Sequence, residues 1–197
     1  MKTLIEGYER FRKGYWREHA ELYSTLARDG QSPPAMVIAC ADSRVAPEAI
    51  FDCAPGEIFV VRNVGALVPP YAPDAGTHGT SAALEFAVTS LNVRTILVLG
   101  HSLCGGIRAL MKGPGAGHGD FIDSWMEIAK TARQRVCDAP EPGDFDAQCL
   151  ACEHEAIRVA LDNLLTFPWI AERVRNGGLN LAGMHFDVQT GLLEEVE

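Results

Sequence analysis

Three side chains that bind soft divalent metals lie at the ends of two apolar segments. Cys40 is near the end of the run 36–41, and His101 and Cys104 follow the run 95–99. Two thiolates and one imidazole form a tetrahedral zinc site with one open position, as in catalytic rather than structural zinc sites. A lone cysteine after a strand more often packs in the core. The glycine-rich turn places the His101 and Cys104 side chains on one side, which favours metal binding over packing. One zinc ion per chain is therefore expected.

An acidic residue and a basic residue follow Cys40 in the sequence. Asp42 is two residues after Cys40, and Arg44 is two residues further on. An arginine beside a carboxylate lowers the pKa of that carboxyl group and fixes its orientation through paired hydrogen bonds. Asp42 and Arg44 are therefore candidate catalytic residues. The alternative for this pair is an ordinary ion pair within a loop.

A second cysteine motif, Cys149-x-x-Cys152 followed by His154, has the spacing of a zinc half-site or a redox pair. The motif falls in a segment with helical periodicity, and no second Cys-x-x-Cys follows to complete four ligands. This spacing therefore favours packing over metal binding.

The elements that must position these residues alternate between strands and helices, which predicts an α/β fold around a mainly parallel sheet. We expect one domain, residues 1–197, with a helical arm over residues 1–30. Thr80 or Ser81 is expected to cap the helix 80–92. The expected strands are 36–41, 58–61, 95–99 and 179–185, and the expected helices after the arm are 80–92, 107–111, 121–137 and 146–165.

Composition and charge indicate which kinds of binding partner and which cellular location to expect. Asp and Glu outnumber Lys and Arg by 26 to 17, for a formal net charge of -9, and no basic block could follow a phosphate backbone. A nucleic-acid partner is not expected. Neither a signal peptide nor an apolar run long enough for a membrane span is evident, so we expect a cytoplasmic protein without a membrane partner. In that reducing compartment, cysteines are thiols or metal ligands.

Two motifs of the chain resemble those of a known family. The segments Cys40-Ala-Asp-Ser-Arg-Val45 and His101-Ser-Leu-Cys-Gly-Gly106 are similar to the two zinc motifs of beta-class carbonic anhydrases. The likeness covers most of the chain and extends through Phe59-Val-Val-Arg-Asn-Val64, Ser81-Ala-Ala-Leu-Glu85 and Asn163-Leu-Leu-Thr-Phe-Pro168.

The resemblance implies a Rossmann-like α/β fold with four parallel strands extended by another strand, and an N-terminal arm that wraps a partner subunit in a dimer or tetramer. It also implies reversible hydration of carbon dioxide to bicarbonate and a proton, in which hydroxide on the zinc attacks carbon dioxide. Asp42, held by Arg44, would accept the hydroxide proton. In some relatives the counterpart of Asp42 binds zinc in a closed state, so Asp42 is also a metal ligand of that state.

The resemblance further indicates the plant-like subtype of the family. Gln31 and Phe59 match residues that mark this subtype, whereas Phe86 stands where the subtype usually has tyrosine. An open site with water on the zinc is expected. By this resemblance, the candidates for lining the substrate pocket are Gln31, Val45, Phe59, Gly65, Phe86 and Gly105.

Two other functions remain open. An enzyme on the same scaffold would hydrolyse carbon disulfide or carbonyl sulfide, and the gas that is consumed distinguishes it. A zinc-binding or thiol-sensing protein without turnover would depend on Cys149 and Cys152, rather than on Cys40 and Cys104, for its metal content. Asp42 and Arg44 argue against this second alternative, because a structural site needs no acid beside an open position.

Overall fold

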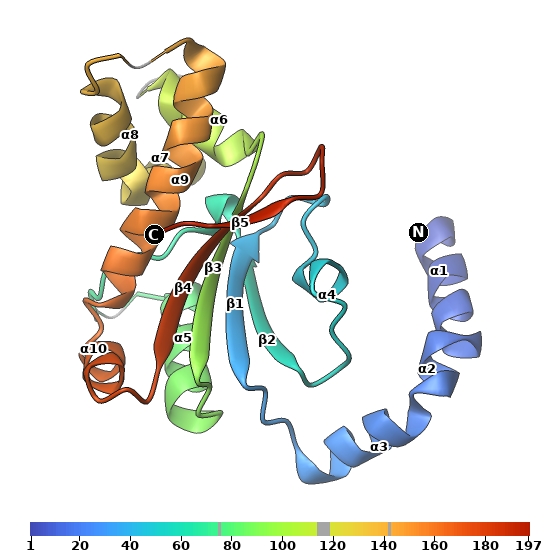
Figure 1. Cartoon of the computed structure of the whole chain (residues 1–197). Coiled ribbons are helices and arrows are strands. Elements are labelled where there is room, and N and C mark those ends of the chain that lie inside the picture. The colour runs from blue at the N-terminus through green and yellow to red at the C-terminus, as the bar shows by residue number, and fades with distance from the viewer. Residues whose placement is uncertain (75, 114–118, 142) are drawn as a thin grey trace.

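A five-stranded sheet forms the centre of the computed structural model, which describes residues 1–74, 76–113, 119–141 and 143–197 (Figure 1). The strand order is β2-β1-β3-β4-β5, in which β1 to β4 are parallel and β5 is antiparallel to β4. The predicted α/β class and mainly parallel sheet are confirmed. The strands are β1 (Ala35–Cys40), β2 (Ile58–Asn63), β3 (Thr95–His101), β4 (Asn180–Phe186) and β5 (Leu193–Glu195).

The central strand β1 is apolar on both faces, as expected for a parallel strand covered on both sides. Met36 and Ile38 point into one core cluster, and Val37 and Ala39 point into another. This alternation follows from the two-residue period of a strand. The sequence of β1 therefore favours its place inside the sheet.

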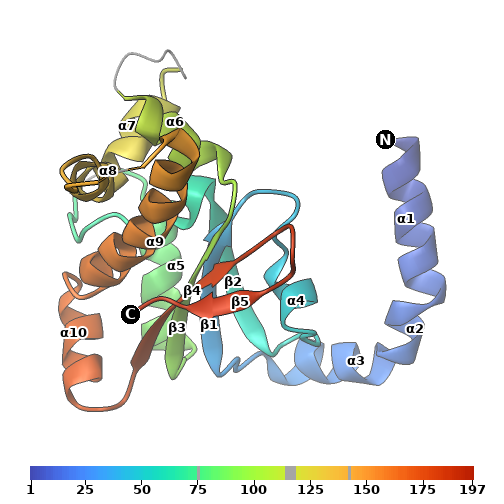
Figure 2. The ribbon, with the colours of Figure 1, turned by 45° about the horizontal axis from the view of Figure 1, so that its top comes forward.

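Helices cover the two faces of the sheet unequally (Figures 1 and 2). The Met36 face packs against α5 (Gly79–Glu85), the π-helical turn η2 (Phe86–Ser90), α9 (Phe145–Leu164) and α10 (Pro168–Arg175). The other face packs against residues of α4 (Pro47–Ile50) and its flank. A third cluster lies at the carboxyl edge of the sheet and joins Cys40, Leu67 and Cys104 to α6 (Gly105–Lys112), α7 (Ile122–Met126), η3 (Glu127–Ala129), α8 (Lys130–Cys137) and α9.

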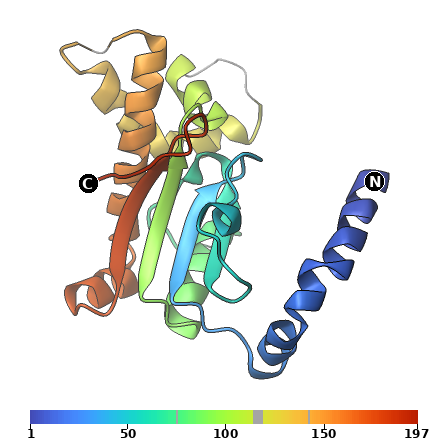
Figure 3. The ribbon, with the colours of Figure 1, turned by 45° about the vertical axis from the view of Figure 1, so that its right-hand side comes forward.

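The N-terminal arm consists of three helices, α1 (Lys2–Lys13), α2 (Tyr15–Glu18) and α3 (Ala20–Asp29). Helices α1 and α2 stand apart from the body in all three views, whereas Leu26 of α3 lies against Gly56 (Figures 1 to 3). The structure describes every residue of these helices, and none of them is buried. Gly14 separates α1 from α2, consistent with the low helix propensity of glycine.

Several expected boundaries differ from the observed ones. The expected capping by Thr80 or Ser81 is wrong, because α5 begins at Gly79 with His78 in the capping position. The expected helix 121–137 is divided into α7, η3 and α8, and the short helices α4 and α10 were not expected, whereas β5 is the additional strand that the resemblance implied. Short elements give weak periodic signals, which explains why the pattern of apolar residues missed them.

No helix among the described residues is both long enough and apolar enough to cross a membrane.

Candidate metal centre

The parallel register of β1 and β3 brings the first two candidate ligands together. Ala39 pairs with Leu99, so Cys40 and His101 both lie at the carboxyl edge of the sheet. Ligands of open α/β sheets bind at this edge. Cys40 is the last residue of β1 and His101 is the last residue of β3.

A tight turn after β3 supplies the third candidate ligand. Leu103 has φ 58°, a left-handed conformation that costs a non-glycine residue about 1–3 kcal/mol. Cys104 follows in an extended conformation and occupies the N-cap position of α6. Arg44 Nη2 donates a hydrogen bond to the Leu103 carbonyl at 3.1 Å, which supports the turn. The strained residue thus turns the chain so that Cys104 faces His101 and Cys40.

The three donor atoms fit a tetrahedral zinc ion. Each lies within 4.8 Å of the others, and the Sγ atoms of Cys40 and Cys104 are 4.0 Å apart. Zinc–sulfur bonds of 2.3 Å require a separation of about 3.8 Å. His101 Nδ1 donates to the Ser102 carbonyl at 2.9 Å, which leaves the Nε2 lone pair free. Nε2 is buried and has no hydrogen-bond partner among the described residues, as expected for a histidine nitrogen that serves as a metal ligand.

The two thiols are poised to bind a cation. A hydrogen bond shared with Cys104 is the largest effect that lowers the pKa of Cys40, to about 4, and Gly65 N–H adds a contact of 3.4 Å to its Sγ. The same shared hydrogen bond, followed by burial, raises the pKa of Cys104. The pair therefore shares one proton, and a divalent cation between the two sulfur atoms would displace it.

Asp42 is held by Arg44 beside this group. Oδ1 accepts hydrogen bonds from the backbone N–H and the Nε of Arg44, both at 2.9 Å, and Oδ2 accepts one from Nη2 at 2.7 Å. The side-chain hydrogen bonds, followed by the backbone one, hold the pKa of Asp42 well below its ordinary value. Because its carboxylate is engaged by Arg44, Asp42 is not one of the three converging donors. Its role as a ligand in a closed state stays a prediction.

Two residues that support the centre were not identified from the sequence. Arg62 donates to the carbonyls of Cys40 at 2.9 Å and of Asp42 at 2.6 Å. Glu153 accepts the backbone N–H of Cys104 at 2.9 Å and is 4% exposed. A signal for Glu153 is present, since it falls on the apolar face of α9 with Cys149, Cys152, Ala156, Ile157 and Ala160. A charged residue in an apolar stripe indicates a buried partner.

The predicted pocket residues differ in their distance from the metal centre. Gly65 and Gly105 lie beside the centre, the first through its contact with Cys40 and the second as the neighbour of Cys104. Val45 is also near in sequence, but its side chain is fully buried in the core cluster of the α4 face.

The other three pocket candidates lie toward the opposite edge of the sheet. Phe59 is four residues before Asn63, which pairs with Cys40, so it is about 13 Å away along the strand. The rings of Phe59 and Phe86 are 5.9 Å apart, and Phe86 is 49% exposed. Gln31 is exposed in the segment that joins α3 to β1. The fold of one chain does not bring these three residues to the metal centre.

The second cysteine motif lies within the core. Cys149 and Cys152 are buried in α9, and they pack in the cluster that underlies α6 to α8. Burial raises the pKa of both thiols, that of Cys152 to about 12, so neither is a reactive thiolate at neutral pH. The geometry favours the packing interpretation of this motif.

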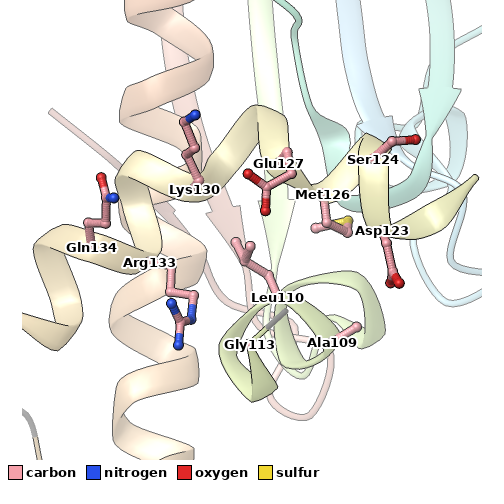
Figure 4. Close-up of a pocket in the computed structure, with 10 residues that line it drawn as sticks. All are labelled: Ala109, Leu110, Gly113, Asp123, Ser124, Met126, Glu127, Lys130, Arg133 and Gln134. Carbon is pink, nitrogen blue, oxygen red and sulfur yellow. The ribbon is translucent and has the colours of Figure 1, made fainter. Parts of the chain in front are cut away.

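A pocket of about 390 Å³ lies between α6 and the segment α7–α8 (Figure 4). Its polar lining includes Asp123, Glu127, Lys130 and Arg133, and none of the predicted site residues lines it. By contrast, a cavity of only about 10 Å³ adjoins His101 and Cys104. A space of this size admits one small atom or ion.

Comparisons with known proteins agree on one family. The sequence pattern of the family described as carbonic anhydrase matches residues 35–193. Beta carbonic anhydrase 5, chloroplastic, from Arabidopsis thaliana is 46% identical over 178 residues, which are 90% of this chain and 58% of that protein. Beta carbonic anhydrase 3 from the same plant is 40% identical over 198 residues, 98% of this chain and 76% of that protein. The chain thus spans less than two thirds of the first relative.

A solved structure shares the fold. The beta-carbonic anhydrase CcaA superimposes with a TM-score of 0.93 at 34% identity, over 99% of this chain and 86% of that one. This likeness includes the arm, because the match covers nearly every residue.

Proposed function

This chain belongs to the beta-class carbonic anhydrase family, and on that premise we propose that it catalyses the reversible hydration of carbon dioxide to bicarbonate and a proton. We propose that a zinc ion is held by Cys40, His101 and Cys104. The observation that carries this proposal is the convergence of these three buried donor atoms, with His101 Nε2 lacking any other partner among the described residues.

The protein supplies orientation and a charged hydrogen-bond acceptor to this chemistry. When bound, zinc lowers the pKa of a water molecule in its open position and so provides a nucleophile near neutral pH. Asp42 is ionised at neutral pH, so its carboxylate would accept a hydrogen bond from the bound water or hydroxide and orient the lone pair that attacks carbon dioxide. Arg44 keeps both carboxylate oxygens in one orientation, and Arg62 fixes the loop through the carbonyls of Cys40 and Asp42.

We propose that the active form is a homo-oligomer, either a dimer or a tetramer. The arm exposes a stripe of large apolar side chains, and exposed apolar stripes of this kind mark protein interfaces. Gln31, Phe59 and Phe86 lie away from the metal centre of their own chain, so they would complete the pocket of a partner subunit. The exposed stripe comprises Leu4, Ile5, Tyr8, Phe11 and Tyr15.

A reducing compartment, with the cytoplasm as the proposed location, fits the state of the cysteines. All six are free in the structure, and two of them are proposed to bind metal as thiolates.

Stopped-flow measurement of carbon dioxide hydration at about pH 7 and about pH 8.5 tests the proposed activity. Protein of known zinc content is compared with Cys104→Ala, and Cys53→Ala serves as the control because Cys53 lies outside the donor group. We expect zinc-dependent activity that rises with pH, disappears in Cys104→Ala and persists in Cys53→Ala.

Two outcomes would contradict the proposal. Zinc-loaded protein without activity at either pH would point to a non-catalytic zinc protein. Consumption of carbonyl sulfide or carbon disulfide in place of carbon dioxide would assign the related hydrolase activity to the same scaffold.

A further inference from the structure

A second cluster of metal-binding side chains lies where α9 meets the C-terminal pair of strands. His154 comes from α9, His185 from β4 and Glu194 from β5. Their donor atoms all lie within 4.8 Å of one another. His154 Nε2 is 3.0 Å from Glu194 Oε1, and His185 Nδ1 is 3.4 Å from the same oxygen. Zinc bonds of 2.0–2.2 Å to nitrogen and oxygen require separations of about 3.4 Å, so these distances match a common cation.

The state of His154 favours a ligand role over a simple ion pair. Its Nε2 atom is buried and makes no hydrogen bond to any described residue, although Glu194 Oε1 is close. The two atoms therefore approach without the alignment that a hydrogen bond requires. Burial, followed by the influence of His185, lowers the pKa of His154. A buried ring nitrogen without a hydrogen-bond partner among the described residues is available to a metal ion.

A buried carboxylate behind His185 completes the arrangement. Glu153 Oε2 is 3.2 Å from His185 Nε2, and each side chain is only 3% exposed. In the tautomer that donates from Nε2 to Glu153, the Nδ1 lone pair faces Glu194 Oε1, so that two acceptors meet without a donor between them. A cation between these two atoms would remove the conflict. A carboxylate that orients a histidine in this manner is typical of metal sites.

We propose that His154, His185 and Glu194 form a second divalent-cation site, separate from the Cys40 centre. Two imidazoles and one carboxylate suit zinc, or cobalt as its substitute, rather than magnesium. Glu194 is 60% exposed, so an ion reaches the site from solvent. Glu153 joins the two centres, because its other oxygen accepts the backbone N–H of Cys104. Occupancy of the second site would thereby hold Glu153 in the orientation that supports Cys104.

Calorimetric titration with zinc tests this proposal on protein whose cysteine site is already loaded. We expect one further equivalent to bind to the wild type. Glu194→Gln and His154→Gln should each weaken this binding by at least about tenfold. Glu195→Gln is the matched control, since Glu195 is an exposed neighbour on β5 outside the cluster, and it should bind as the wild type does. Circular dichroism would establish that each variant is folded.

Cobalt gives a readout that does not depend on activity. X-ray absorption at the cobalt edge should show only nitrogen and oxygen ligands for the second ion, whereas the cysteine site contributes sulfur. The proposal is wrong if the folded wild type binds no second ion. It is equally wrong if both substitutions leave the binding unchanged. Neither result bears on carbon dioxide hydration, which is measured separately.

Discussion

Arg44 donates three hydrogen bonds to the carboxylate of Asp42, two to Oδ1 at 2.9 Å and one to Oδ2 at 2.7 Å. These bonds hold the pKa of Asp42 below its ordinary value. Asp42 is therefore an anion of fixed orientation at neutral pH, two residues from a candidate zinc ligand. Its charge and its orientation both depend on Arg44.

Replacement of Asp42 by asparagine should leave zinc bound and remove most of the activity. The amide keeps the size of the side chain but loses the negative charge and one acceptor oxygen, and loss of orientation at a reacting group costs about a hundredfold. Stopped-flow kinetics with metal analysis would measure both properties. Asp29→Asn is the control, because Asp29 pairs with Arg28 on the exposed arm. Unchanged turnover in Asp42→Asn would remove Asp42 from the mechanism.

The pairing of Asp42 and Arg44 also predicts a pH dependence of stability. Because the pKa of Asp42 is lowered in the folded state, its stabilising contribution is complete above the unfolded pKa of about 3.9 and is lost as the pH falls through the folded value. The difference in unfolding free energy between wild type and Asp42→Asn should stay constant from about pH 7 to about pH 5 and should shrink as the pH falls below about 4. Urea unfolding at fixed zinc concentration measures it. A difference that stays constant below about pH 4 would show that Asp42 titrates normally in the folded protein.

Glu153→Gln should weaken zinc binding at the cysteine site by about tenfold to a hundredfold, as changes in outer residues of metal sites commonly do. Glutamine can still accept the Cys104 N–H, but its amide is a poor partner for His185 Nε2. Competition with a chelator would measure the affinity. Glu155→Gln is a suitable control, since Glu155 pairs with Arg135 and Arg158 near the surface. Equal affinities in both variants would contradict the supporting role of Glu153.

Gly100→Ala should destabilise the protein by about 1–3 kcal/mol through overpacking. A Cβ at this position would lie 2.6 Å from Cδ1 of Ile157, where α9 crosses β3. Gly79→Ala should have little effect, because a Cβ at Gly79 meets nothing within 4 Å. Denaturant unfolding of the two variants distinguishes a packed contact from a general effect of alanine. Similar stabilities would show that Ile157 moves aside at little cost.

Charges on the apolar stripe of the arm should dissociate the proposed oligomer. The double substitution Tyr8→Glu and Phe11→Glu places two carboxylates where apolar contact is proposed, and light scattering after size exclusion would report a smaller mass. Arg10→Glu adds a negative charge on another side of α1 and should keep the wild-type mass. Activity should fall with the mass, because Gln31, Phe59 and Phe86 would then be absent from the site. A wild type that is already monomeric would contradict this proposal.

The local pattern of the sequence predicted the α/β class and indicated the three donors, and the resemblance to two family motifs made the donor set specific. Cys40 and His101 end apolar runs that form neighbouring parallel strands, and the ends of such strands meet at one edge. Cys104 was included in the donor set because it follows His101 by three residues. These features depend on short-range spacing and on one rule of topology, so they can be read without coordinates.

Other features depend on contacts between residues far apart in the chain. Glu153 is separated from Cys104 by 49 positions, and only the packing of α9 against β3 brings them together. His154 seemed to belong with Cys149 and Cys152, yet it faces His185 and Glu194 because the helix turns its cysteines into the core. Sequence spacing defines which residues share a strand end or a helix face. The tertiary structure alone decides which of these faces meet, because that choice comes from burying apolar surface across the whole chain.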